Sequence, residues 1–145
     1  MNATDGRRGQ PPIGYALRKL DRLIEESFER TLGKRGITRR QWQILNALGD
    51  GGCTLAALTD ALAPFLDSAA GETVQPHIDP LRRQGLVHND GGAVTLTDTG
   101  RDLFRSLTTD VEAIRELTTT GLDQREYDRT ITNLQTMIRN LEDGR

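Results

Sequence analysis

Apolar residues recur at spacings of three and four through most of the chain, which is the pattern of amphipathic helices. The first stripe predicts a helix over about residues 14–33, and its members are Leu17, Leu20, Ile24, Phe28 and Leu32. Gly33 and Gly36 end this helix. Thr38 and Gln41 then begin the next one, because they have the spacing of a capping box, in which each side chain binds the backbone N–H of the other residue.

The middle of the chain has the pattern of a helix-turn-helix. The second helix has a buried stripe formed by Trp42, Leu45 and Leu48, and residues 49–52 break it. Thr54 caps a third, short helix with the apolar residues Leu55, Leu58 and Leu62. Residues 63–71 are rich in turn formers and lead to residues 72–87, where Gly85 stands just after the end of a fourth helix. The apolar residues of that helix are Val74, Ile78 and Leu81.

A small β-wing is predicted directly after this unit. Residues 86–88 and 93–97 are short runs of β-forming residues, and the sequence Asn-Asp-Gly-Gly at 89–92 favours a turn between them. The fold class is therefore mainly α with a small β-wing, that is, a winged helix-turn-helix.

Two longer helices complete the chain. The first begins at Thr97 and ends at Gly121, and its stripe is Leu103, Leu107, Val111, Ile114 and Leu117. The second carries an a/d pattern, with spacings of four, three, four and three, formed by Tyr127, Ile131, Leu134, Ile138 and Leu141. Such a stripe packs against partner helices, so we expect these two helices and the N-terminal one to form a dimerisation lobe.

Length and composition favour one domain in a reducing compartment. The 145 residues are enough for a single compact domain, predicted over 14–145, after a flexible N-terminal arm at 1–13. The arm has no apolar segment typical of a secretory signal, and nothing approaches a membrane span. Cys53 is the only cysteine and cannot form an internal disulfide, which agrees with a cytoplasmic protein.

The charge is distributed unevenly along the chain. The net charge is −2, but residues 14–45 carry eight basic and four acidic side chains, whereas residues 110–145 carry five basic and eight acidic ones. One end of the molecule is therefore better suited than the other to face nucleic-acid phosphates.

The order of elements and four sequence stretches resemble the MarR family of bacterial transcription regulators. These stretches are GITRRQWQIL at 36–45, TLAALTDAL at 54–62, TVQPHIDPLRRQGLV at 73–87 and VTLTDTGRDLF at 94–104. The resemblance covers nearly everything from Gly14 to Leu141.

The resemblance implies that one part of the domain binds DNA and another part forms the dimer. The DNA-binding lobe would span about 37–97, flanked by N- and C-terminal dimerisation helices at about 14–33 and 98–143. A homodimer would place its paired recognition helices in successive major grooves of a pseudopalindromic operator in double-stranded DNA. A crevice between the lobes would bind a small aromatic or anionic effector, which makes a ligand-responsive repressor the expected function.

Polar side chains at the start of the fourth helix are the candidates for reading bases. They are Thr73, Gln75 and His77, of which Gln75 is the best candidate because its amide can pair bidentately with adenine. Arg82, Arg83 and Thr54 are better placed for phosphates, and His88 adds a candidate on the wing. The alternative is that these residues form only a solvated face.

Three features of the sequence are unusual for a protein that binds DNA strongly. The wing stretch 88–93 contains no Lys or Arg, and residues 72–90 have a net charge of −1, which is unusual for a surface that displaces counterions. Pro76 fits a first helical turn, but Pro80 lies inside the helix, so we expect a bend or a short 3₁₀ segment. The alternative function is a winged-helix dimer with weak or lost DNA binding that acts as a protein-interaction or small-molecule-sequestering module.

Effector contacts are expected from both aromatic and basic residues. Tyr15, Trp42 and Phe104 are the aromatic candidates, and core packing explains each of them equally well. Arg39 and Arg40 could hold an anionic effector, with a solvated helix start as the alternative.

No pattern of residues predicts catalysis or metal binding. The chain has no GxSxG, HExxH or phosphate-binding glycine loop, and its two histidines have no cysteine cluster nearby. Cys53 could sense oxidants, but a buried, inert thiol is favoured. We therefore expect neither an enzyme, nor a metal site, nor a cofactor.

Overall fold

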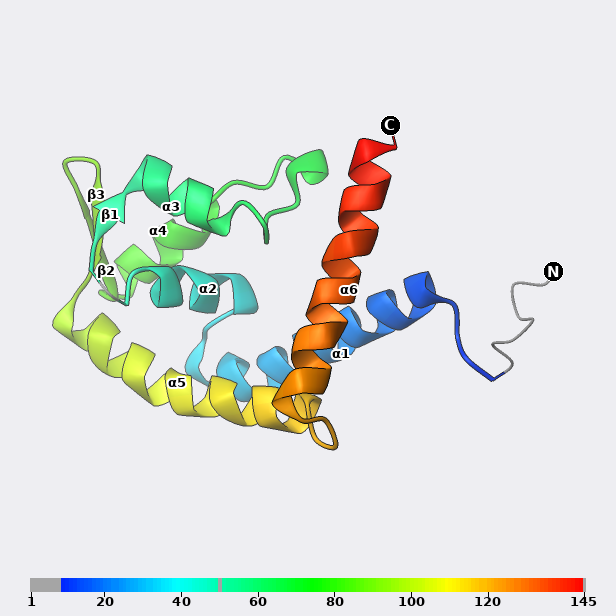
Figure 1. Ribbon diagram of the computed structural model, residues 1–145. Coiled ribbons are helices and arrows are strands. Elements are labelled where there is room, and N and C mark those ends of the chain that lie inside the picture. Colours follow the sequence, from blue (N-terminus) through cyan, green and yellow to red (C-terminus); the bar gives the residue numbers. More distant parts are fainter. Residues whose placement is uncertain (1–8, 50, 145) are drawn as a thin grey trace. The chain divides into compact units, whose positions relative to one another are not determined.

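The computed structural model describes residues 9–49 and 51–144, and the chain divides into two compact units, Met1–Val111 and Glu112–Arg145 (Figure 1). The helices are α1 (Ile13–Leu32), α2 (Arg39–Ala47), α3 (Leu55–Leu62), α4 (Gln75–Arg83), α5 (Asp98–Thr118) and α6 (Gln124–Asp143). The short 3₁₀ helices are η1 (Gly33–Arg35) and η2 (Ser68–Ala70). Most of the predicted flexible arm, residues 1–8, lies outside the described residues, as does Asp50 in the predicted helix break.

The helix starts that the sequence predicts are formed. Thr38 Oγ1 accepts from the backbone N–H of Gln41 at 3.1 Å, and Gln41 Oε1 accepts from that of Thr38 at 3.0 Å, which confirms the capping box of α2. Thr54 caps α3 by accepting from the N–H of Ala57 at 3.0 Å. Thr97 Oγ1 accepts from the N–H of Gly100 at 2.9 Å, so α5 begins where the sequence predicts.

The wing is part of a three-stranded antiparallel sheet with the order β1-β3-β2. Its strands are β1 (Cys53–Thr54), β2 (Val87–Asp90) and β3 (Ala93–Leu96). The turn is shorter than predicted, because Asn89 and Asp90 pair with Val94 and Ala93. Only Gly91 and Gly92 remain as a two-residue connection, and both have positive φ (57° and 85°), which suits the twist of a hairpin.

Most of the core of the first unit comes from the predicted apolar stripes, and Ile37 and Ile44, which were not predicted, are also fully buried. Helix α2 packs against α3 and α4, and α4 packs against β2. The most deeply buried side chains are Leu32, Ile37, Ile44, Leu45, Leu48, Leu58, Leu62, Ile78, Leu81 and Leu107. Burial of this apolar surface provides the main stabilisation of the unit that carries the helix-turn-helix.

Helix α4 is α-helical throughout Gln75–Arg83, so the expected 3₁₀ segment does not form. Pro80 lacks the N–H that would bind the carbonyl of Pro76, and one hydrogen bond is lost in the first turns. Buried Ile78 and Leu81 anchor the helix on both sides of Pro80, and this packing offsets the loss. Helix α4 is therefore short and keeps the α-helical assignment through Pro80.

Two helices keep large apolar side chains exposed. On α1, Phe28 and Leu32 are buried, whereas Ile13, Tyr15, Leu17, Leu20 and Leu23 are 45–51% exposed. No described side chain of α6 is buried, and its predicted a/d stripe includes Ile138 (54% exposed) and Leu141 (76%). Among the described helices, none is both long and apolar enough to cross a bilayer.

Candidate DNA-reading helix and effector cavity

The first turn of α4 presents part of the predicted DNA-reading set to solvent. Thr73 is exposed just before the helix, and Gln75, its first residue, is half-buried. Gln75 Nε2 donates to Asp79 Oδ1 at 2.7 Å, one helical turn away. This bond fixes the direction of the amide group and leaves its second N–H and its carbonyl oxygen for a base edge.

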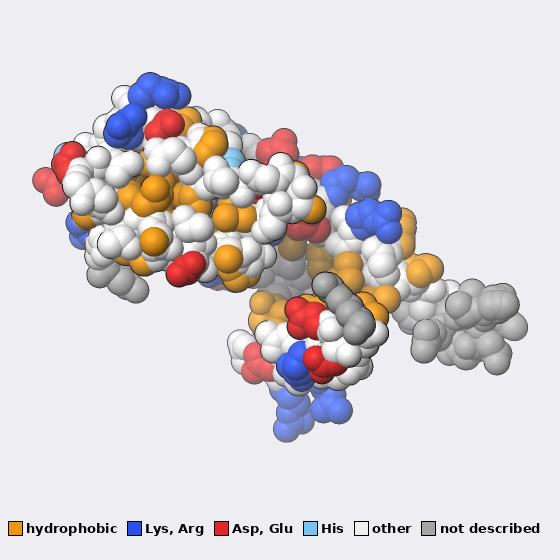
Figure 2. Space-filling model, turned by 90° about the horizontal axis from the view of Figure 1, so that it is seen from above, with side chains coloured by type: hydrophobic (Ala, Val, Ile, Leu, Met, Phe, Trp, Pro, Cys, Tyr) orange, Lys and Arg blue, Asp and Glu red, His pale blue; other side chains and the backbone are white. Residues whose placement is uncertain are grey.

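The last turn of α4 carries the two exposed arginines. Arg82 Nη2 lies 3.7 Å from Asp79 Oδ1, so Asp79 contacts both Gln75 and Arg82, a role that sequence analysis missed. The spacing of Asp79 from Arg82 (i,i+3) and from Gln75 (i,i+4) could have predicted both contacts. Arg83 is also exposed. On the face shown in Figure 2, the described basic side chains are interspersed with acidic ones rather than gathered in one patch.

The remaining predicted DNA contacts lie on other elements. Thr54 is exposed at the start of α3, and its hydroxyl can still donate while its oxygen caps the helix. His88 is exposed on β2, opposite Thr95 of β3. The hairpin tip is formed by Asp90 and two glycines, so the wing carries no positive charge to place against phosphates.

A cavity of about 410 Å³ lies in the same unit, between α1, α2 and the start of α4. Its lining residues are Asp21, Glu25, Thr38, Arg39, Arg40, Gln43, Pro64, Phe65, Glu72 and His77. The volume lies within the range of small-molecule sites, and the lining combines an apolar wall at Pro64 and Phe65 with charged groups.

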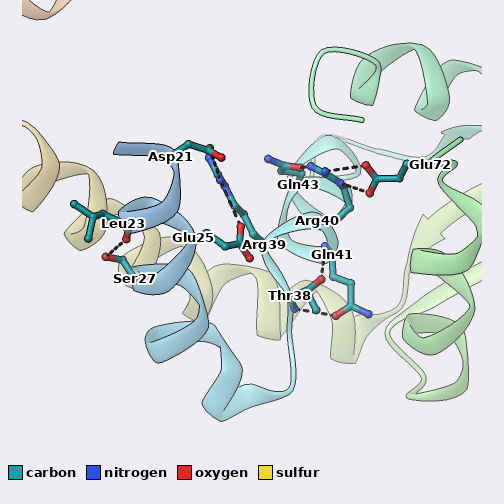
Figure 3. Close-up of polar contacts among 10 residues, drawn as sticks. All are labelled: Asp21, Leu23, Glu25, Ser27, Thr38, Arg39, Arg40, Gln41, Gln43 and Glu72. Atoms are coloured by element: carbon teal, nitrogen blue, oxygen red, sulfur yellow. Dashed lines mark hydrogen bonds and ion pairs between the residues drawn. The ribbon is translucent and has the colours of Figure 1, made fainter. Parts of the chain in front are cut away.

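The two arginines of the cavity point in opposite directions (Figure 3). Arg39 turns towards α1, where its Nη1 lies 3.1 Å from Asp21 Oδ1 and 3.5 Å from Glu25 Oε1. Its guanidinium also lies over the ring of Phe28, 5.5 Å from the centroid. The carboxylates of Asp21 and Glu25 are 74% and 43% exposed, so water competes for these contacts.

Arg40 forms a bidentate pair with Glu72. Its Nε donates to Oε2 at 2.8 Å and its Nη2 donates to Oε1 at 3.0 Å, while its Nη1 donates to Gln43 at 2.7 Å (Figure 3). Glu72 Oε1 also accepts from the backbone N–H of Asp67 at 2.8 Å. His77 Nε2 lies 2.8 Å from Glu72 Oε2 and donates to it, because an ionised carboxylate can only accept.

Glu72 is thus a hub that sequence analysis missed, because its partners are 5 and 32 residues away. Hydrogen bonds from Arg40 and then from the backbone N–H of Asp67 lower the pKa of Glu72 from 4.5 to about 2. His77, predicted to face DNA, instead points to this carboxylate and lines the cavity.

Replacement of Glu72 should change the acid stability of the protein. A carboxyl group with a lowered folded-state pKa stabilises the fold above pH 4.5, and this contribution is lost as the pH falls from about 4.5 to about 2. We expect Glu72→Gln to lower the free energy of unfolding at pH 7 by about 1–2 kcal/mol, below the roughly 3 kcal/mol of an unscreened shift. Denaturant unfolding from pH 7 to pH 2, with exposed Glu29→Gln as the matched control, measures this. Parallel pH profiles for Glu72→Gln and the unmodified protein would contradict the assignment.

The aromatic effector candidates lie apart from the cavity lining. Trp42 is buried, and its ring stacks on that of Phe104 with centroids 5.4 Å apart and planes inclined by 21°. Tyr15 is 51% exposed on α1, with Lys19 Nζ 5.7 Å from its ring centroid. Of the five predicted effector contacts, the structure brings Arg39 and Arg40 together in the cavity.

The other chemical candidate is Cys53, which is half-buried on β1 opposite Val94. Within residues 9–49 and 51–144, no cluster of three or more His, Cys, Asp or Glu side chains is arranged to hold a metal ion.

Comparisons with known proteins place this arrangement among DNA-binding regulators. The chain is similar to BpsR of Bordetella bronchiseptica, whose DNA binding is regulated by 6-hydroxynicotinic acid, with 30% identity and a TM-score of 0.71 over 87% of this chain and 93% of BpsR. A probable transcriptional regulator from Pseudomonas aeruginosa is 25% identical, with a TM-score of 0.71 over 86% of this chain and 96% of that one.

A MarR family protein of Mycobacterium tuberculosis, solved in complex with DNA, is 21% identical, with a TM-score of 0.65 over 88% of this chain and 98% of that one. No protein-family model matches the sequence, and no curated protein matches it. The structural likeness spans most of each chain and confirms the predicted winged helix-turn-helix fold.

Proposed function

Since the chain belongs to the MarR family of transcription regulators, we propose that it is a sequence-specific, homodimeric DNA-binding regulator that responds to a small molecule. The observation that carries this proposal is the likeness to BpsR, a protein with ligand-regulated DNA binding, over nearly its whole length. The compared proteins are regulators, so the proposal assigns no catalytic step. A regulator of this kind acts on chromosomal DNA, and we place it in the cytoplasm.

Helix α4 is the proposed DNA-reading element. Gln75 has one N–H and a carbonyl oxygen available for an adenine, and exposed Thr73 lies next to it. Arg82 and Arg83 at the other end of the helix, with the start of α3 at Thr54, are assigned to phosphates. His88 on the wing, which has no Lys or Arg, remains a candidate for a weak additional contact.

The exposed apolar side chains support a homodimer. The apolar side chains at the start of α1 and along α6 form two stripes that are exposed to solvent in a single chain. A second copy of the chain would cover them. We therefore assign α1 and α6 to the dimer interface.

The cavity is the proposed effector site. Arg39 and Arg40 favour a ligand with an anionic group, and the wall formed by Pro64 and Phe65 favours an apolar or aromatic body. Trp42 and Phe104 are assigned to the core that supports the cavity rather than to ligand contact. Since 6-hydroxynicotinic acid regulates BpsR, it is the first compound to test.

Two substitutions on α4 separate base reading from phosphate contact. We expect Gln75→Ala to relax the preference for one base pair in each half-site by about 1–3 kcal/mol. We expect Arg83→Ala to weaken binding to all sequences and to reduce the salt dependence by about one released ion per subunit. Binding to fragments of upstream intergenic DNA measures both effects.

Gln84→Ala, at the end of the same helix, is the matched control for Gln75→Ala, and Arg105→Ala, an exposed arginine on α5, is the control for Arg83→Ala. Unchanged sequence preference in Gln75→Ala would contradict the assignment of this residue to base reading.

One observation favours a second candidate function. The wing lacks positive charge, and residues 72–90 have a net charge of −1. A winged-helix dimer without DNA binding, acting as a protein-interaction or small-molecule-sequestering module, would have these properties. It would bind the effector with the same affinity in the presence and absence of DNA.

A further inference from the structure

We propose that Arg40, Glu72 and His77 form a latch that holds the first turn of α4, and that an anion bound to Arg40 in the cavity opens it. The inference rests on the proposed function, because it gives a route from the effector cavity to the proposed DNA-reading helix. Glu72 lies three residues before the first residue of α4, so its position affects where that helix begins.

The latch joins three segments of the first unit through one carboxylate. Each oxygen of Glu72 accepts two hydrogen bonds, at distances of 2.8–3.0 Å. The donors are Arg40 in the first turn of α2, the backbone N–H of Asp67 in the loop after α3, and His77 in the first turn of α4. Glu72 is only 19% exposed, so water competes weakly for these bonds.

The first turn of α4 lacks the side-chain capping hydrogen bond that commonly holds the start of a helix. Its N-cap residue, Val74, makes no side-chain capping bond, and Pro76 has no N–H to donate. Burial of Val74 holds the backbone just before the helix. Within the described residues, the bond from His77 to Glu72 links this turn to the rest of the unit outside α4.

Each nitrogen of the Arg40 guanidinium donates one hydrogen bond, although the side chain lines the cavity. The edge formed by Nε and Nη2 already holds both oxygens of Glu72, and Nη1 donates to Gln43, so an anion that pairs bidentately with the Nε and Nη2 edge must displace Glu72. The displaced carboxylate then no longer holds both Arg40 and His77 in place. An anion on Arg39 has no such effect, because the carboxylates that it displaces belong to α1.

A ligand displaces Glu72 only if it makes favourable contacts in addition to its ion pair with Arg40. The same hydrogen bonds that keep the pKa of Glu72 near 2 must be replaced. An aromatic carboxylate can add contacts with Phe65 and Pro64, whereas acetate cannot. The latch therefore discriminates between an aromatic acid and a simple anion.

Amide hydrogen exchange of the unmodified protein and of latch variants tests this inference without DNA. We expect Arg40→Gln and Glu72→Gln to raise exchange about tenfold at residues 73–78, because each removes charge-assisted hydrogen bonds from the hub. His77→Gln leaves the pair of Arg40 and Glu72 intact and should raise exchange at 73–78 alone, which guards against a variant that simply unfolds. The matched controls are Arg22→Gln and Glu26→Gln, which break an exposed ion pair with an N–O distance of 3.8 Å on α1.

The same measurement with added compounds tests ligand control. We expect 6-hydroxynicotinic acid to raise exchange at residues 73–78 in the unmodified protein and to have no further effect in Arg40→Gln, whereas acetate changes neither. Unchanged exchange at 73–78 in all three latch variants, or an equal rise across every helix, would overturn the latch. Absence of DNA binding by the unmodified protein would instead refute the proposed function, and the exchange result would stand apart from it.

Discussion

Trp42→Ala lowers the free energy of unfolding by about 3–5 kcal/mol, the range for loss of a buried Trp side chain. Trp42 is only 4% exposed on α2 and stacks on Phe104 of α5, so the truncation removes both buried area and an aromatic pair. Helices α2 and α5 are closely packed and their backbones shift little, so the cavity left by the truncation closes only in part. Trp42 is the only tryptophan in the chain, so the variant has no tryptophan fluorescence with which to follow unfolding. Denaturant unfolding followed by circular dichroism measures the change in both proteins.

Phe65→Ala is the comparison for Trp42→Ala, because Phe65 is an aromatic residue that is 50% exposed. We expect its cost to stay below about 1 kcal/mol. A similar loss in the two variants would show that Trp42 does not have the core role assigned to it.

Gly100→Ala is the second large effect that we expect, with a loss of about 2–3 kcal/mol in the free energy of unfolding. A Cβ atom at position 100 would overlap the backbone carbonyl oxygen of Leu86. The start of α5 cannot move away easily, because Thr97 donates to the carbonyls of Gly85 and Leu86 at 2.6 and 3.0 Å. Helix propensity favours Ala over Gly by only about 1 kcal/mol, so the steric term decides the sign.

Gly14→Ala provides the matched control, since Gly14 also lies in the first turn of a helix but its Cβ would meet no atom within 4 Å. We expect this variant to be neutral or up to about 1 kcal/mol more stable. Thermal unfolding of both variants checks the prediction, and a stabilised Gly100→Ala would contradict the packing of α5 on Leu86.

Much of the fold follows from local sequence signals. The capping box at Thr38, the cap at Thr54 and the start of α5 at Thr97 depend on neighbours three residues away, and all three are formed. Strand β1 could not be predicted, because two residues carry no period and the strand exists only through its pairing with β3. The turn of the wing was predicted too long for the same reason, since strand pairing extends through Asp90.

The site was less accessible to sequence reasoning than the fold. Arg39 and Arg40 were expected near an effector, but their opposite directions depend on carboxylates 18 and 32 residues away. His77 was expected at the DNA surface because helical spacing gives its face but not its partner. By contrast, Asp79 as the partner of Gln75 follows from i,i+4 spacing alone and was within reach.

Binding of the purified protein to its own upstream intergenic DNA across a salt series tests the central claim most directly. With Arg82 and Arg83 in each of two subunits on phosphates, about four ion contacts lower the affinity about a hundredfold between roughly 50 and roughly 200 mM salt. Specific binding with this salt dependence is the result that we expect from a DNA-binding regulator. No binding to any fragment at the lowest salt concentration would contradict the account and favour the winged-helix module without a DNA function.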